Sequence, residues 1–206
     1  MKNKLFNFVT IILVIFGLNL TNLSNASELE NNEVKQKAHS GFIAKQDNKI
    51  IKTIGKYEDR HAPFSTFKVA LAVMGFDAGI LENKDLPKWA FKEEYEKLFQ
   101  SWYTRKKGLE YNWCQEHTPA TFMKNSVVWF SHQITERLGA KKFQDYVSKL
   151  NYGNQDVSGT LGEDGLYKND GLLNSWLGTS LQISPLEQVE LLEKLLDNKL
   201  ALSSQA

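Results

Sequence analysis

The sequence predicts an α+β fold in which helices pack on an antiparallel sheet. Segments on either side of Gln46-Asp47-Asn48 alternate apolar and polar residues, which is typical of two antiparallel strands joined by a tight turn. A helix is predicted from Thr66 to about Leu81, and its apolar residues cover nearly all of its faces, so it should lie buried. Because two strands alone make a marginal sheet, we expect further strands to be needed to cover this helix.

The first 26 residues have the pattern of a signal peptide. Lys2 and Lys4 precede a long apolar run, and Ser24 and Ala26 are small residues at the two positions that a signal peptidase reads. We predict cleavage after Ala26, a mature domain over residues 27–206, a periplasmic or secreted location and no stable membrane anchor after cleavage. The alternative is an uncleaved anchor, since the uncharged stretch is long enough to span a bilayer.

Three further segments follow the buried helix. Residues 89–103, which are aromatic and charged, are predicted to be helical, and residues 117–151 are predicted to form two or three short helices with a stop at Gly139. Residues 152–180 contain six glycines and little periodicity, which predicts a long ordered loop.

The last predicted helix has a well-marked start. Ser184 is its expected N-cap, Pro185 lies in the first turn, and Glu187 follows three residues after the cap, as in a capping box.

The composition excludes several kinds of partner. The 25 Lys and Arg residues are balanced by 24 Asp and Glu residues, so nothing indicates a nucleic-acid partner, which would favour a basic excess. Cys114 is the only cysteine, and the four histidines show no metal-ligand spacing. We therefore expect no intramolecular disulfide and no metal, and we expect Cys114 to be a small buried hydrophobe.

A serine and a lysine three residues apart begin the apolar helix. This spacing places Ser65 and Lys68 on one face, one turn apart, with the serine near the positive end of the helix dipole. Apolar surroundings lower the pKa of a lysine, so its free amine can accept a proton or react with an electrophile such as CO2. By themselves these two residues are also explained by a helix cap followed by a solvated lysine.

Three other motifs extend this pattern. Together with Ser65-Thr66-Phe67-Lys68, the segments Ser126-Val127-Val128, Tyr152-Gly153-Asn154 and the stretch around Trp176 stand in the order and spacing of the class D (oxacillinase-type) serine β-lactamases. The chain resembles this family from about Gly41 to its end. Taken singly, Ser126 could be a helix cap, the second motif a turn and Trp176 a core residue.

The resemblance implies a penicillin-recognising (β-lactamase/transpeptidase-like) fold and hydrolysis of β-lactam antibiotics through a serine acyl-enzyme. It implies that Ser65 is the nucleophile and that Lys68 carries CO2 as an N-carboxylate and acts as the general base, with no other cofactor. Ser126 would pass a proton to the leaving nitrogen. Phe67 and Val128 would wall the substrate pocket, and the indole N–H of Trp176, at the same pocket, would donate a hydrogen bond to the carboxylate on Lys68. Tyr152 and Asn154 would support the site.

The sequence departs from the family in one motif. No Lys-[Ser/Thr]-Gly strand follows the last predicted helix, so we expect the domain to be C-terminally incomplete and its activity to be doubtful. That strand would supply the second oxyanion donor, whose loss costs about 3 to 4 kcal/mol of transition-state stabilisation. The alternatives are a penicillin-sensing domain that stops at the stable acyl-enzyme, a cell-wall transpeptidase and an inactive fragment.

Overall fold

The structure is a computed structural model, and it describes residues 41–95, 112–166, 168–200 and 202. The predicted signal peptide and cleavage site lie outside these residues. The chain divides into two compact units, one formed by Met1–His61 with Ile183–Lys199 and the other by Ala62–Gln182 with Leu200–Ala206. Each unit is described by itself.

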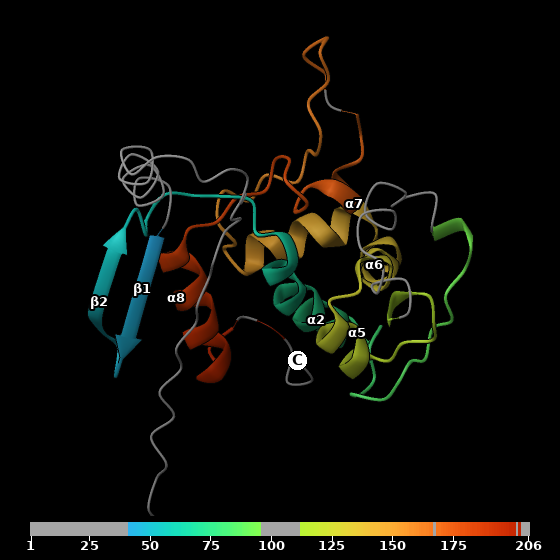
Figure 1. The fold of residues 1–206 in the computed structure, drawn as a ribbon, viewed down its shortest axis with the longest axis horizontal. Helices are drawn as coiled ribbons and strands as arrows, with labels where there is room; N and C mark the ends of the chain where they lie inside the picture. Colours follow the sequence, from blue (N-terminus) through green and yellow to red (C-terminus); the bar gives the residue numbers. More distant parts are fainter. Residues whose placement is uncertain (1–40, 96–111, 167, 201, 203–206) are drawn as a thin grey trace, which may run out of the picture. The chain divides into compact units, whose positions relative to one another are not determined.

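The first unit contains the predicted hairpin and the C-terminal helix (Figure 1). Strands β1 (Gly41–Gln46) and β2 (Lys49–Gly55) pair antiparallel, with a bulge between Ala44 and Lys45. Asp47 and Asn48 form the turn with positive φ angles, the backbone conformation that two-residue hairpin loops require and that Asp and Asn tolerate. The hairpin prediction is confirmed.

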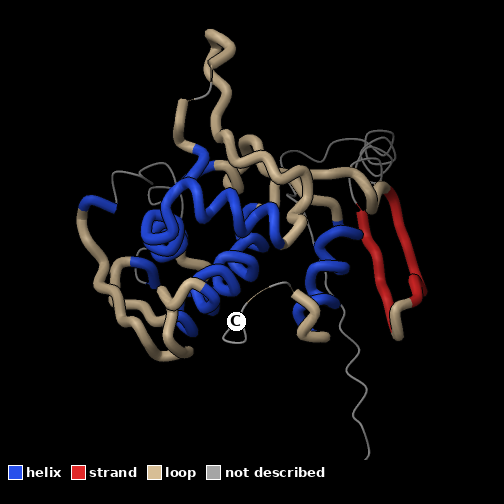
Figure 2. Tube along the Cα trace, turned by 180° about the vertical axis from the view of Figure 1, so that it is seen from behind, coloured by secondary structure: helices blue, strands red, loops and turns tan. Residues whose placement is uncertain are grey.

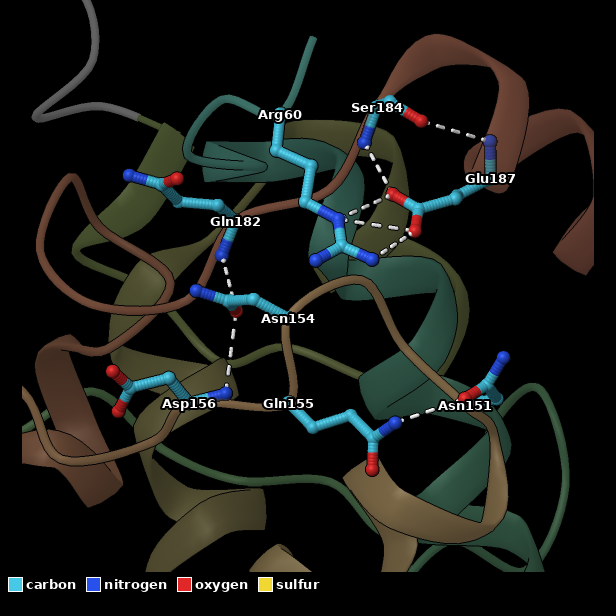
Figure 3. Close-up of polar contacts among 8 residues, drawn as sticks. All are labelled: Arg60, Asn151, Asn154, Gln155, Asp156, Gln182, Ser184 and Glu187. Atoms are coloured by element: carbon cyan, nitrogen blue, oxygen red, sulfur yellow. Dashed lines mark hydrogen bonds and ion pairs between the residues drawn. The ribbon is translucent and has the colours of Figure 1, made fainter. Parts of the chain in front are cut away.

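Helix α8 (Pro185–Leu196) lies beside β1 in this unit, as Figures 1 and 2 show from opposite sides. Its start is the predicted capping box, in which the Ser184 hydroxyl accepts from the Glu187 N–H and the Glu187 carboxylate accepts from the Ser184 N–H. The same carboxylate accepts two hydrogen bonds from Arg60 Nε, at 3.1 and 3.0 Å (Figure 3). These bonds join the segment after β2 to the first turn of α8.

The second unit is helical. It contains the 3₁₀ turn η1 (Phe64–Phe67) and the helices α2 (Lys68–Asp77), α5 (Pro119–Asn125), α6 (Val128–Lys149) and α7 (Gly171–Asn174). Helix α2 contacts α5 and α6, and α6 contacts α7. Gly139 interrupts α6 with φ 72° and ψ 160°, so the predicted helix stop is a break within a longer helical run.

The buried helix is shorter than predicted at both ends. Residues 64–67 form the tighter η1 turn, and α2 ends at Asp77, because Gly79 takes a positive φ of 69° just beyond the helix. The chain then folds back, and Leu81 packs so closely on Gly75 that a Cβ there would lie 2.8 Å from the leucine side chain. Leu81 is therefore buried without belonging to the helix.

The helix predicted over residues 89–103 is wrong in its first part, and residues 96–103 lie outside the described part of the chain. Trp89 exchanges two backbone hydrogen bonds of 2.9 Å with His117 instead, and its ring lies 4.4 Å from that of Phe130. Packing of the half-buried Trp89 ring against α6 outweighs the helix propensity of this segment.

Residues 152–180 form the predicted loop, and the single-turn helix α7 within it was not predicted. In Figure 1 the orange part of this loop, around residues 160–166, extends away from the helices of its unit. Asp170 anchors the base of the excursion by accepting from the Thr160 N–H and hydroxyl, both at 2.7 Å. These bonds contribute to holding the pKa of Asp170 below its ordinary value, against the opposing effect of burial.

No helix in the described ranges is long and apolar enough to cross a membrane. Those same residues contain no group of three or more histidine, cysteine, aspartate or glutamate side chains that could hold a metal ion.

Candidate active site

The structure brings Ser65 and Lys68 together at the junction of η1 and α2. Lys68 Nζ lies 3.0 Å from Ser65 Oγ and donates a hydrogen bond to it. Ser65 is exposed, whereas Lys68 is only 2% exposed. The pair therefore presents an accessible hydroxyl with an amine buried behind it.

Burial changes the acid–base chemistry of this amine. Removal from water lowers the pKa of Lys68 from 10.5 to about 7, because the charged ammonium loses its hydration. None of the ion pairs among the described residues involves Lys68, so no carboxylate offsets that loss. A substantial fraction of Lys68 is then the free amine near neutral pH.

Aromatic rings form the dry surroundings of the amine. Phe67 is fully buried, and its ring lies 6.0 Å from Phe143, 4.9 Å from Tyr152 and 5.9 Å from Trp176. The Lys68 amine lies 5.1 Å from the centre of the Trp176 ring. Phe67 therefore packs beneath the site, and its side chain is not exposed to solvent.

Trp176 also offers an unused hydrogen-bond donor. Its side chain is fully buried, and its Nε1 has no hydrogen-bond partner among the described residues. Buried donors are nearly always paired, so an unpaired one beside Lys68 suits an additional acceptor at this place.

Ser126 lies in the turn between α5 and α6. Its backbone is left-handed, with φ 54° and ψ 45°, and Val128 follows it as the buried first residue of α6. The turn is held from the side by the Trp113 indole N–H, which donates to the Asn125 carbonyl at 2.9 Å. No hydrogen bond within the described residues joins Ser126 to Ser65 or Lys68.

Asn154 ties the loop after α6 to the segment that follows Trp176 (Figure 3). Its side-chain amide donates to the Ser180 carbonyl at 2.8 Å, and its side-chain oxygen accepts from the backbone N–H groups of Asp156 and Gln182. A backbone bond from Asn154 N to Gln182 O adds a fourth contact. These contacts fit the predicted supporting role, as does the packing of Tyr152 against the site.

Two residues of the site were not found from the sequence. Phe64, just before the nucleophile, has a positive φ of 45°, which is uncommon for a bulky residue and occurs most often where function maintains strain. Its N–H donates to the Trp176 carbonyl at 3.0 Å. Its ring packs against Gly178, where a Cβ would come within 3.2 Å of it. No sequence signal distinguishes this phenylalanine from an ordinary apolar residue.

His132, on α6, is the second site residue that was not found from the sequence. It is 3% exposed, and its ring lies 5.9 Å from that of Trp176 at an interplanar angle of 78°. Burial lowers its pKa to about 4, a hydrogen bond with the Leu173 backbone acts in the opposite direction, and the charge of nearby Lys68 lowers it further. The imidazole is therefore neutral near pH 7. A histidine on the apolar face of a predicted helix was the available signal.

Comparison with known proteins identifies the family. Residues 21–204 match the model of the penicillin binding protein transpeptidase domain. The chain belongs to this family. It is 41% identical over 157 residues to β-lactamase OXA-9 of Klebsiella pneumoniae, covering 74% of this chain and 50% of that protein. It is 40% identical over 145 residues to β-lactamase OXA-1 of Escherichia coli, covering 70% and 46% respectively.

A solved structure agrees with these matches. The class D β-lactamase OXA-427 superposes with a TM-score of 0.64 at 40% identity, over 76% of this chain and 58% of that one. The predicted resemblance to class D β-lactamases and the predicted fold class are confirmed. The chain spans about half the length of these curated relatives.

Proposed function

We propose that this chain carries the acylation centre of a serine hydrolase acting on β-lactams. The observation that carries the proposal is the exposed Ser65 hydroxyl, 3.0 Å from a buried Lys68 amine whose pKa is lowered to about 7. A serine hydroxyl is a weak nucleophile until a neighbouring base takes its proton. The relatives named as β-lactamases supply the substrate class.

Ser65 Oγ attacks the carbonyl carbon of the four-membered ring, and the bond from that carbon to the ring nitrogen breaks. The backbone N–H of Ser65 supplies half of the oxyanion hole that stabilises the intermediate. Ser126 passes a proton to the departing nitrogen, for which its side chain must approach the bound substrate. A water molecule then hydrolyses the ester at Ser65 and completes turnover.

We extend the proposal to N-carboxylation of Lys68. A carboxylate on the Lys68 amine supplies the general base for acylation and for hydrolysis of the ester. The neutral amine needed to take up CO2 is favoured by burial, and the unpaired Trp176 Nε1 offers the donor that such a group requires. The buried Phe67 ring helps to exclude water from the Lys68 amine.

The second candidate is a sensor that stops at the acyl-enzyme. It is favoured by 29% identity over 171 residues to the regulatory protein BlaR1 of Bacillus licheniformis, although these residues are only 24% of that protein. A sensor would form the same ester at Ser65 but would not release it.

The test measures acylation and release separately on the purified chain. A fluorescent penicillin is followed by intact mass, and a reporter cephalosporin is followed by absorbance, with and without added bicarbonate. We expect an ester at Ser65 that is absent in Ser65→Ala, and turnover that rises with bicarbonate. Lys68→Ala should lower the turnover by about 10²- to 10⁴-fold, the usual contribution of a general base.

The matched control is Lys141→Ala, which removes a lysine that is 90% exposed on α6 and should leave both rates unchanged. An ester that forms and persists would favour the sensor. Labelling that survives in Ser65→Ala, or full turnover in Lys68→Ala, would overturn the assignment.

We also propose that the protein is exported and that its leader is removed after Ala26. The mass of the protein recovered from the periplasm or the medium tests this cleavage directly. A recovered chain that still begins at Met1 would contradict it.

A further inference from the structure

We propose that His132 is a positioning residue that fixes the orientation of the Trp176 indole above the Lys68 amine. The inference rests on the proposed function and adds a residue to its site. The supporting observation is the contact between the His132 ring and the Trp176 ring.

His132 approaches the indole from α6. It lies one helical turn after Val128, on the same face of α6, and α6 contacts both α2 and α7. The imidazole is nearly perpendicular to the indole, at 78° and 5.9 Å. Edge-to-face pairs are a preferred arrangement of aromatic rings, so this contact favours the present orientation of the indole.

The other contacts given for Trp176 act differently on its ring. Phe64 holds the Trp176 backbone through the 3.0 Å hydrogen bond to its carbonyl. The Phe67 ring lies 5.9 Å away at 31°, which is closer to parallel than to perpendicular. Because Nε1 has no hydrogen-bond partner among the described residues, it does not anchor the ring either. Of the ring contacts that the structure gives for Trp176, only that of His132 is perpendicular.

A histidine suits this position for a second reason. The Leu173 backbone, in α7, acts on the imidazole and raises its pKa, so His132 also interacts with the short helix that ends just before Trp176. An apolar side chain could fill the same volume but could not pair with that backbone group. Lys68 is the charged group that acts on the imidazole, and burial keeps the imidazole neutral beside it.

The experiment observes the indole directly, so that it does not depend on catalysis. The tryptophans are replaced by fluorotryptophan, and the fluorine resonance that disappears in Trp176→Phe is assigned to Trp176. In His132→Leu we expect this resonance to shift and broaden because the ring samples several orientations. In His132→Phe, whose ring can keep the perpendicular contact with the indole, we expect a sharp resonance near its original position.

The matched control is His117→Gln. His117 is also fully buried and also lies against a tryptophan, Trp129, at 5.7 Å and 55°. This substitution should move the Trp129 resonance and leave that of Trp176 in place. A Trp176 resonance that is unchanged in His132→Leu, or equally perturbed in His132→Phe, would overturn the inference.

A second measurement links the orientation to function. His132→Leu should raise the bicarbonate concentration for half-maximal turnover by about tenfold, the lower end of the effect of removing a residue that orients a functional group. His132→Phe should restore it to within about twofold of the original value. Failure of Ser65 to form an ester would defeat the proposed function, whereas the fluorine resonances would still decide the role of His132.

Discussion

Replacement of Lys68 by methionine should stabilise the protein near neutral pH while removing its proposed base. The reason is that burial of the amine is costly. The interval between the ordinary pKa of 10.5 and the lowered pKa of about 7 corresponds to about 5 kcal/mol, at about 1.4 kcal/mol for each pKa unit. Methionine has a similar length and no charge, so it avoids this cost.

The sign of the pH dependence follows from proton binding. Below about pH 7 both the folded and the unfolded protein carry a charged Lys68, so the full cost is present. Between about pH 7 and 10.5 the unfolded protein binds more protons than the folded one, so the free energy of unfolding of the original protein rises with pH. Above pH 10.5 Lys68 is neutral in both states, so the free-energy cost of burying its charge has disappeared.

We therefore expect Lys68→Met to raise the free energy of unfolding near pH 7 by about 4 kcal/mol, which is the cost of about 5 kcal/mol less about 1 kcal/mol for the lost hydrogen bond to Ser65. The gain should vanish as the pH approaches 10.5. Urea unfolding in buffers freed of CO2, repeated at several pH values, measures the difference between the two proteins.

The matched control is Lys141→Met, which changes a lysine whose side chain is 90% exposed and should give no pH-dependent difference. A Lys68→Met difference that stays constant from about pH 7 to 10 would refute the reasoning, because it would mean that burial does not lower the pKa of this amine.

Three further substitutions test other parts of the second unit. Trp176→Phe keeps a ring but removes the unpaired indole N–H, so the stimulation of turnover by bicarbonate should fall several-fold, and unchanged stimulation would exclude the indole as a donor. Tyr146→Phe removes a 2.6 Å hydrogen bond to Asp77 and should lower the free energy of unfolding by about 1 to 2 kcal/mol, with a lower apparent melting temperature. Gly171→Ala should cost more, about 3 kcal/mol or above, because its Cβ would collide with the Val157 carbonyl oxygen; a melting temperature equal to that of the original protein would contradict this packing.

Local chemistry explains why much of the fold was predictable from the sequence. Asp47-Asn48 specifies the hairpin turn, and Ser184 with Glu187 specifies the start of α8, because each signal acts within a few residues. The helix predicted through residues 89–93 failed because a distant contact, the ring of Phe130, determines where Trp89 lies.

The sequence alone determined that a hydroxyl and an amine lie one turn apart, at Ser65 and Lys68, and it placed Trp176 in the same site through its resemblance to a family. Only the tertiary structure decided that the amine is dry, that the indole lies over it and that His132 lies against the indole. Spacing along a helix fixes neighbours within one turn, whereas the loss of water around an amine depends on side chains brought together from far along the chain.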